Sequence, residues 1–456
     1  MHFKFDKMPR KDLTVNFDRP IGELTYERQM VGIGGANVCP IPENIIQPIK
    51  DLENKMIRVF LQEYFFVYPD HGVFDWSRMD AFMDSLEKTG AKILASICLK
   101  PRVLYPVVDP KIFWPNNEEE WQNIVYELVK RYSVDRKIVT HWGVLNEINI
   151  GEFGGCPHEI KNPEDYHRFY VMTVDAILKA WPEAKVGGPS LAGFDKPYME
   201  KFISLVAENK TPCDFVSYNV YSGKTSDHAN AAKETKELLD KAGLDAEIYQ
   251  TELNTWFPDA YIEEQAYSGR YASSLAAVLM DLNETPITGS FQFDMYDAYV
   301  DPDDFEQFYS ITPFMLRHWN EIPHRFGLFD MDGRVRPQYF VYKMLKEMKG
   351  QRLNAESSDE NIRVCASVRD GVWRILIVNF SEGEGEDKVA NIKMTGVERG
   401  LYRLESFRLD DDNLYDKETY QLKSVESRLS FALPEYAAHV YLPEDSVTLI
   451  TLTPVK

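Results

Sequence analysis

The sequence predicts an α/β protein in which a (β/α)₈ barrel, or TIM barrel, is followed by an antiparallel β-sandwich. Eight short apolar runs alternate with amphipathic helical patterns over residues 20–349. Continuous apolar strands alternating with helices are typical of a parallel sheet, and eight such units are typical of a closed barrel. Residues 350–456 instead hold short strands of period two, separated by polar turns. That pattern is typical of an antiparallel sandwich.

The eight predicted barrel strands leave room between them for one helix and its loops. The runs are VGIGGANV from Val31, MIRVFL from Met56, AKILASICL from Ala91, IVTHWGVL from Ile138, AKVGGPS from Ala184, CDFVSYNVY from Cys213, AEIYQTEL from Ala246 and ITGSFQFDMY from Ile287.

Several of the intervening helices carry start and stop signals. The segment after Asp75 has apolar residues at helical spacing, with Asp75 as a capping residue and Gly90 at the end. The run Asn162-Pro163-Glu164 reads as N-cap, first helical residue and first-turn acid of a helix that reaches Ala180. The motif PQYFVYKMLKEM predicts a last helix that ends near residue 350.

The second domain is predicted from six strand patterns. They are RVCASV, VWRILIVNF, LYRLESFRL, RLSFAL, AAHVYL and SVTLITL. We expect an N-terminal strand within residues 1–19 to join this sheet, and the domain to brace the barrel.

Composition excludes several classes of function. The formal net charge is −21, so the basic footprint that nucleic-acid binding needs is missing, and an anionic membrane surface is disfavoured. No apolar stretch approaches the ~18 residues that span a bilayer. The five cysteines show no CxxC spacing, and the first residues hold no apolar run typical of a signal peptide. A cytoplasmic protein is the simplest expectation, although a secreted protein whose leader was removed would look the same.

Two glutamates stand where a barrel enzyme places its chemistry, at the C-terminal ends of strands. Glu147 follows Asn146 at the end of the fourth predicted strand, and Glu252 lies at the end of the seventh. Because these strands lie at most half a circumference apart, the two carboxyl groups can face each other across the barrel mouth. Glycosidic bond cleavage requires two opposed carboxyl groups, one protonated and one ionised.

Taken singly, each of these glutamates is better explained as a solvated loop acid. The dipeptide Asn-Glu occurs four times in the chain, so it carries little information by itself. Only the pair at Asn146 closes a hydrophobic strand. The combination of two glutamates at the ends of the fourth and seventh strands favours a paired active site.

The chain resembles the retaining (β/α)₈ glycoside hydrolases, and most closely glycoside hydrolase family 39, which includes β-xylosidases and α-L-iduronidases. VLNEINIGEF is similar to that family's acid/base segment, and QTELNTW to its nucleophile segment. The resemblance implies that Glu147 is the general acid/base and Glu252 the nucleophile. It extends over most of the chain, from VNFDRPIGEL near the N-terminus to SVTLITL near the C-terminus.

The resemblance also implies roles for residues around the two glutamates. Asn146 would bind the sugar 2-hydroxyl, Arg58 would hold Glu252 ionised, and Tyr221 would donate to the nucleophile. Further residues are candidates for the rim of the substrate site: Asn219, Asn254, Trp256, Lys100, Asp294 and Tyr296. Each rim candidate except Asn219 is equally well explained as a packing or surface residue.

The sequence departs from the family pattern at two positions. Ile148 stands where the family usually has proline after the acid/base glutamate, and Asn219 stands where a histidine is usual at the end of the sixth strand. Because that position lies near the sugar in relatives, a standard β-xylosidase specificity does not follow from the resemblance.

These features predict a retaining, exo-acting glycoside hydrolase for a neutral glycoside such as a β-xyloside, with no metal and no cofactor. Five potential metal ligands cluster after the fourth strand, but their spacing matches no zinc pattern: Cys156, His158, Glu159, Asp165 and His167. The expected partner is an oligosaccharide or glycoside, and a homo-oligomer stays open. The alternatives are a non-catalytic sugar-binding relative, or another barrel enzyme such as an aldolase that uses Lys100 or a metal-dependent hydrolase.

Overall fold

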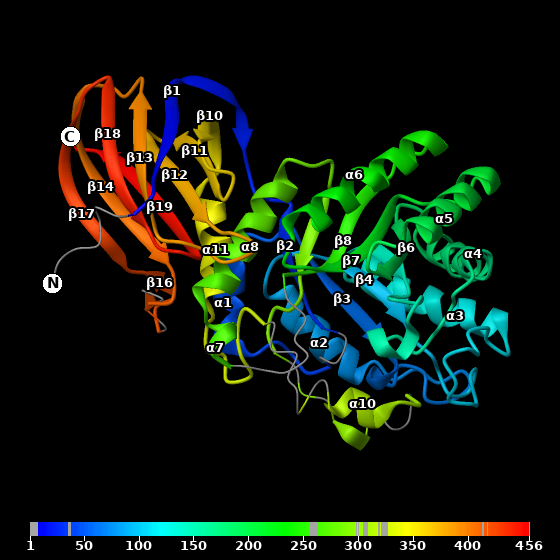
Figure 1. Ribbon diagram of the computed structural model, residues 1–456. Helices are drawn as coiled ribbons and strands as arrows, with labels where there is room; N and C mark the ends of the chain where they lie inside the picture. Colours follow the sequence, from blue (N-terminus) through cyan, green and yellow to red (C-terminus); the bar gives the residue numbers. More distant parts are fainter. Residues whose placement is uncertain are drawn as a thin grey trace.

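The protein consists of a closed barrel and a β-sheet domain packed side by side, here described from a computed structural model (Figure 1). The described residues are 8–34, 38–255, 263–297, 299, 301–303, 309–317, 320, 327–412, 415–416 and 418–455.

Eight parallel strands close the barrel in chain order, which confirms the predicted fold class. Strand β2 pairs with β9 as well as with β3, and the pairing of Met30 with Phe291 closes the ring. The strands are β2 (Gln29–Gly32), β3 (Met56–Gln62), β4 (Lys92–Cys98), β5 (Val139–Val144), β6 (Lys185–Ala192), β7 (Phe215–Tyr221), β8 (Glu247–Asn254) and β9 (Gly289–Gln292).

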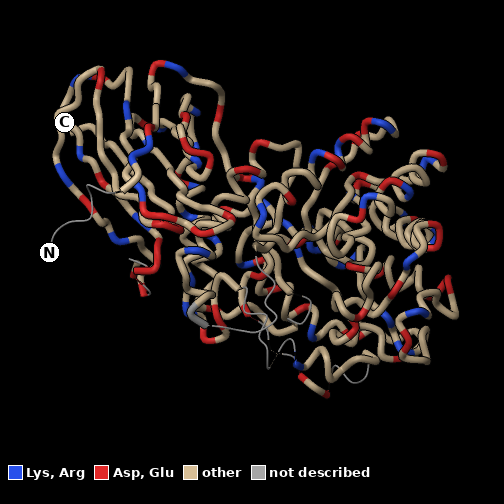
Figure 2. Tube along the Cα trace, in the orientation of Figure 1, with Lys and Arg blue, Asp and Glu red and all other residues tan. Residues whose placement is uncertain are grey.

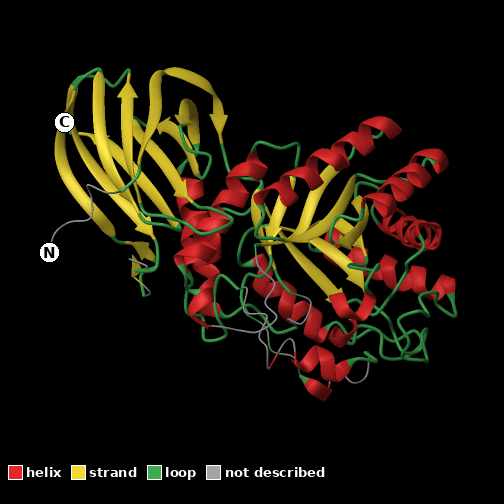
Figure 3. Ribbon diagram, in the orientation of Figure 1, coloured by secondary structure: helices red, strands yellow, loops and turns green. Residues whose placement is uncertain are grey.

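Helices cover the outside of this ring (Figure 3). Asn162 caps α4 through a hydrogen bond to the backbone N–H of Glu164, as its sequence predicts. The helices between and after the strands are α1 (Glu43–Asp51), α2 (Ser77–Glu87), α3 (Glu118–Val129), α4 (Pro163–Ala180), α5 (Lys196–Asn209), α6 (Thr225–Ala242), α7 (Glu263–Ala266), α8 (Gly269–Asn283), α10 (Thr312–Leu316) and α11 (Pro337–Glu347). Shorter helical turns lie at Glu63–Phe65, Lys130–Asp135 and Gly151–Gly154.

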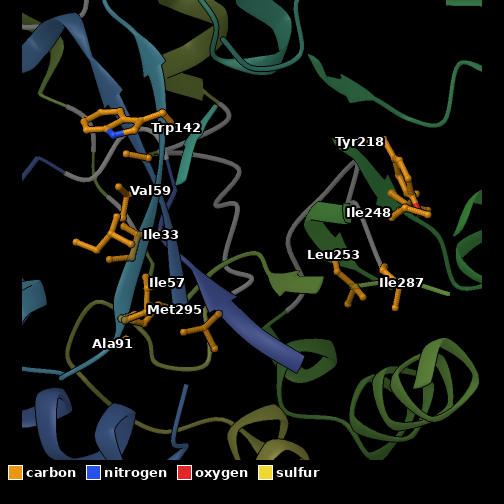
Figure 4. Packing of buried hydrophobic residues seen from close by; sticks show 14 of the residues in the cluster. Ile33, Ile57, Val59, Ala91, Trp142, Tyr218, Ile248, Leu253, Ile287 and Met295 are labelled. Atoms are coloured by element: carbon orange, nitrogen blue, oxygen red, sulfur yellow. The ribbon is translucent and has the colours of Figure 1, made fainter. Parts of the chain in front are cut away.

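Alternate residues of each strand face the helices and the barrel interior. On β3, Ile57 and Val59 belong to the core under the helices (Figure 4). Met56 belongs instead to an apolar cluster at the floor of the interior, together with Met30, Leu94, Phe215, Tyr249 and Phe291. Arg58 follows Met56 on the inward face and is fully buried. The interior therefore changes from apolar at the floor to polar toward the C-terminal ends of the strands.

The second domain is one curled sheet of nine strands in the order β17-β14-β19-β12-β11-β10-β1-β13-β18. Its strands from the C-terminal region are β10 (Gly350–Ser357), β11 (Ile362–Arg369), β12 (Val372–Asn379), β13 (Lys388–Thr395), β14 (Gly400–Leu409), β17 (Ser424–Ala432), β18 (Glu435–Leu442) and β19 (Ser446–Pro454). A small hairpin, β15 (Tyr415–Asp416) and β16 (Gln421–Leu422), is attached. The edge strands β17 and β18 approach each other, since Ser430 and Tyr436 are joined by a 2.7 Å hydrogen bond.

The N-terminal strand β1 (Arg10–Leu24) lies in the middle of this sheet. It pairs antiparallel with β10 and parallel with β13, which is the one parallel pairing among the described strands of the domain. The sheet surrounds its own core, in which Leu13 and Val15 of β1 are buried.

The two units share a core and several ion pairs. Helix α8 contacts β12, β14 and β19 of the sheet. Arg363 and Asp281 form an ion pair of 2.9 Å across the junction, and Arg270 and Asp445 form one of 3.2 Å. The sheet therefore packs against the barrel over an extended area.

Acidic and basic residues are interspersed over both units (Figure 2). Among the described residues, none of the helices is long and apolar enough to cross a bilayer.

Candidate active site

Glu147 sits on a backbone of unusual conformation just beyond β5. Leu145 and Glu147 have φ angles of +64° and +45°, a region that residues other than glycine adopt rarely. The backbone N–H of Glu147 donates to the carbonyl oxygen of Ser190 over 2.7 Å, which ties this turn to β6. Such strained conformations persist at functional sites where the surroundings enforce them. Here they aim the side chain of Glu147 into the barrel mouth.

Glu252 lies inside the last part of β8 and is held by two donors. Nη1 of Arg58 donates to Oε1 over 2.8 Å, and the hydroxyl of Tyr221 donates to Oε2 over 2.5 Å. The side chains of Arg58 and Glu252 are 1% and 6% exposed. Both donors hold the carboxyl group of Glu252 in place through hydrogen bonds to its two oxygens.

Two asparagine side chains connect Glu252 with Glu147. Nη2 of Arg58 donates to Oδ1 of Asn146 over 2.7 Å. Nδ2 of Asn219 donates to the same Oδ1 over 3.3 Å and to Oε1 of Glu147 over 2.8 Å. The two glutamates thus belong to one hydrogen-bond network, which joins strands β3, β7 and β8 with the turn after β5.

The environment of Glu147 favours its protonated form. Burial is the main cause that raises the pKa of this carboxyl group well above its usual value, and the nearby charge of Glu252 adds to it. The hydrogen bond from Asn219 and the charge of Arg58 act in the opposite direction. A carboxyl group that is kept protonated beside an ionised one is the arrangement expected of an acid and a nucleophile.

A short loop after Glu147 packs against its carboxyl group. A Cβ atom built on Gly154 would lie 2.0 Å from Oε2 of Glu147 and 2.6 Å from its Cβ. The loop is anchored from the other side, because the backbone N–H of Ser310 donates to Glu152 over 2.9 Å and the hydroxyl of Tyr309 donates to the carbonyl oxygen of Gly155 over 2.8 Å. The loop therefore confines the side chain of Glu147.

We expect Gly154→Ala to lower kcat by about 10- to 100-fold, because displacement of a reacting group by about 1 Å can cost this much. The new methyl group would overlap Cβ of Glu147, which cannot move away as a flexible side-chain end could. Steady-state kinetics of the purified variant measure the effect. Gly383→Ala is the matched control, since the nearest atom to its added Cβ is 4.0 Å away. Equal activity of both variants would show that the loop does not position Glu147.

The polar side-chain groups of three predicted rim residues form hydrogen bonds with backbone groups of the protein. The ammonium group of Lys100 donates to the carbonyl oxygens of Asp109 and Pro157, both over 2.7 Å, and burial lowers its pKa to about 8. The side chain of Asn254 donates to the carbonyl oxygen of Phe293 over 2.6 Å. The carboxyl group of Asp294 accepts from two backbone N–H groups.

Their role in substrate binding stays a prediction, as does that of Tyr296, whose hydroxyl donates to the carbonyl oxygen of Cys39 over 3.4 Å. The position of Lys100 does not suit an aldolase, which would need the amine free in the cavity. Trp256 lies outside the described residues.

The five potential metal ligands after β5 do not converge. His158 contacts the carbonyl oxygen of Leu99 over 3.0 Å, and His167 contacts Oγ1 of Thr211 over 2.9 Å. Within the described parts of the chain, no three His, Cys, Asp or Glu side chains are arranged to hold a metal ion.

Three residues of the site were not predicted from the sequence: Thr251, Ser96 and Gly154. Oγ1 of Thr251 donates to Oδ1 of Asn219 over 2.8 Å, and Oγ of Ser96 accepts from Arg58 over 3.3 Å. Because successive side chains of a strand point to opposite faces, Thr251 should lie on the face of β8 away from Glu252. An irregularity in the pairing of β7 with β8 lets both side chains reach the site, because Asn219 pairs with Glu252 and Tyr218 with Gln250. Such a bulge leaves no mark in the sequence pattern.

Comparisons of the sequence with known proteins identify its family. A sequence model described as "Glycosyl hydrolases family 39" matches residues 44–421. The chain is 23% identical over 332 residues to a β-xylosidase of Caldicellulosiruptor saccharolyticus, an alignment that covers 67% of this chain and 63% of that protein. The chain thus spans less than two thirds of that relative's length.

Solved structures share the fold at low identity. The crystal structure of a monomeric β-xylosidase from Caulobacter crescentus CB15 superposes with a TM-score of 0.77 at 17% identity, over 98% of this chain and 100% of the other. A glucosidase from Croceicoccus marinus superposes with a TM-score of 0.72 at 18% identity, over 98% and 99% of the two chains.

Proposed function

The chain belongs to glycoside hydrolase family 39, and from this premise we propose that it is a retaining, exo-acting hydrolase of neutral glycosides such as β-xylosides. The observation that carries the proposal is the shared network around the two glutamates. Arg58 binds Glu252 with one nitrogen and Asn146, next to Glu147, with another. A single guanidinium group therefore binds the carboxyl group of Glu252 and the neighbour of Glu147, so that both glutamates lie in one site.

The proposed reaction proceeds by double displacement. Glu252 attacks the anomeric carbon while Glu147 gives its proton to the departing oxygen. Glu147 then takes a proton from water, which attacks the same carbon and releases the sugar with net retention. Carboxyl groups ~5–5.5 Å apart suit this route, whereas inverting enzymes need roughly 6.5–9.5 Å for the intervening water.

The charges of the site support a neutral sugar. Arg58 is already bound to Glu252, and the ammonium group of Lys100 is bound to two carbonyl oxygens. A uronate carboxylate would compete with these contacts and would also meet the overall charge of −21. The name of the β-xylosidase relative supports a neutral glycone as well, although the bacterial orthologue of an α-L-iduronidase also shares the fold, at 12% identity.

We expect one or more aryl glycosides in a panel of β-xyloside, β-glucoside, β-galactoside and α-arabinoside to be hydrolysed with retention. Release of the aryl group identifies the sugar. The first anomer that appears in a ¹H NMR time course identifies the stereochemistry, because the free sugar mutarotates slowly enough to observe it. Initial release of the opposite anomer would contradict double displacement. Binding of these glycosides without any product would favour a non-catalytic sugar-binding protein.

A further inference from the structure

The hydrogen bonds around Asn219 have a direction that can be derived from their chemistry. The guanidinium group of Arg58 can only donate, so Oδ1 of Asn146 is an acceptor. A group that shares this oxygen must present an N–H, and Asn219 does so over 3.3 Å. The amide of Asn219 is therefore oriented with its nitrogen toward Glu147. The opposite orientation would place two acceptor oxygens against each other.

This orientation leaves the oxygen of Asn219 in need of a donor, and Thr251 supplies it. Oγ1 of Thr251 donates to Oδ1 of Asn219 over 2.8 Å. Asn219 and Thr251 are 0% and 1% exposed, so water does not readily replace either partner. A buried amide with both ends satisfied is held firmly in one orientation.

The two oxygens of Glu147 are consequently not equivalent. Oε1 accepts the amide hydrogen of Asn219 over 2.8 Å. Among the described residues, Oε2 has no hydrogen-bond partner, and it lies on the side of Gly154. An oxygen that already accepts an N–H is the poorer place for a proton.

We propose that Asn219, oriented by the hydroxyl of Thr251, is a positioning residue that keeps Oε1 of Glu147 as an acceptor and so assigns the transferable proton to Oε2. The proposal rests on the proposed function, because it concerns the general acid of that reaction. It differs from direct sugar binding by Asn219, since both of its N–H groups are engaged by Asn146 and Glu147.

A consequence concerns the pH dependence of the reaction. The ionisable groups that act on Glu147 include Glu252 on β8, Arg58 on β3, Cys156 on the loop after β5 and Tyr221 on β7. Against burial and the charge of Glu252, Asn219 holds the pKa of Glu147 lower than it would otherwise be. Loss of this donor should raise the pKa of Glu147. Because kcat/KM requires Glu147 protonated, its alkaline limb should then move to higher pH.

The experiment measures kcat/KM against pH for wild type and three variants, with an aryl glycoside whose leaving group needs protonation. Asn219→Ala should move the alkaline limb upward by about 1 pH unit, and Thr251→Val should move it upward by about half as much. Thr251→Ser keeps the hydroxyl and is the matched control. It should retain the wild-type profile, and its comparison with Thr251→Val is informative even where Asn219→Ala folds poorly.

Other outcomes would overturn the inference. An unchanged limb in Thr251→Val and Asn219→Ala, with kcat/KM lowered equally at every pH, would assign both residues a purely structural role. A rise in KM alone would assign Asn219 to sugar binding. Failure of the proposed function is distinguishable from either, because wild type itself would then hydrolyse none of the glycosides.

Discussion

Glu252→Gln is expected to lower kcat by on the order of 10⁴-fold or more, because the amide cannot form the glycosyl ester. The replacement has the same shape. Its amide oxygen can still accept from Arg58, and its amide nitrogen can donate to the hydroxyl oxygen of Tyr221, at the positions where these residues bind the carboxylate over 2.8 and 2.5 Å. The loss should therefore come from chemistry and leave KM within about tenfold of wild type. Initial rates on the best aryl glycoside measure the effect.

A matched control separates this loss from a general disturbance of the barrel. Glu63 is also a buried glutamate near a strand end, and burial raises its pKa to about 8. Its carboxyl group accepts from the backbone N–H of Lys100 over 2.6 Å. Glu63→Gln keeps that acceptor and should leave kcat nearly unchanged. If Glu252→Gln were as active as Glu63→Gln, Glu252 would not be the nucleophile.

Glu147→Ala is expected to affect substrates according to their leaving groups. A sugar or alkyl leaving group needs a proton, so its kcat/KM should fall by about 10²–10⁴-fold. A dinitrophenyl leaving group departs without a proton, so its kcat/KM should fall by less than about tenfold. Deglycosylation would also lack its base, and kcat on the activated substrate should therefore decrease.

Azide provides an independent check on Glu147→Ala. A small anion can enter the space left by the carboxylate and attack the glycosyl-enzyme without a general base. Added azide should raise kcat on the activated substrate and yield a glycosyl azide of retained configuration, detectable by mass spectrometry and NMR. Equal losses on activated and unactivated substrates, with no effect of azide, would mean that Glu147 is not the general acid/base.

The barrel could be predicted from the sequence because its signal is local and repeated. Each strand is a continuous apolar run, and each helix has a clear amphipathic pattern and, as at Asn162, a cap. That Glu147 and Glu252 lie in one site could be predicted because polar residues that end buried strands meet at one edge of a barrel. Both are buried in the structure, at 8% and 4% exposure.

Contacts that depend on irregular backbone could not be predicted in the same way. The bulge that brings Thr251 to Asn219 and the close approach of Gly154 to Glu147 arise from the packing of separate segments. The parallel pairing of β1 with β13 joins strands from opposite ends of the chain, which no local pattern reports. For the same reason, the hydrogen bonds of the Lys100 ammonium group to two backbone carbonyl oxygens could be seen only in the folded chain.

Trapping of the glycosyl-enzyme tests the pairing of the two carboxyl groups most directly. A 2-deoxy-2-fluoro glycoside of the preferred sugar, with a dinitrophenyl leaving group, forms the covalent intermediate faster than the intermediate is hydrolysed. Mass spectrometry of the intact protein should then show one added fluoroglycosyl group, and peptide mapping should place it on Glu252. Hydrolysis of the preferred glycoside with no adduct, or an adduct on another residue, would contradict the account.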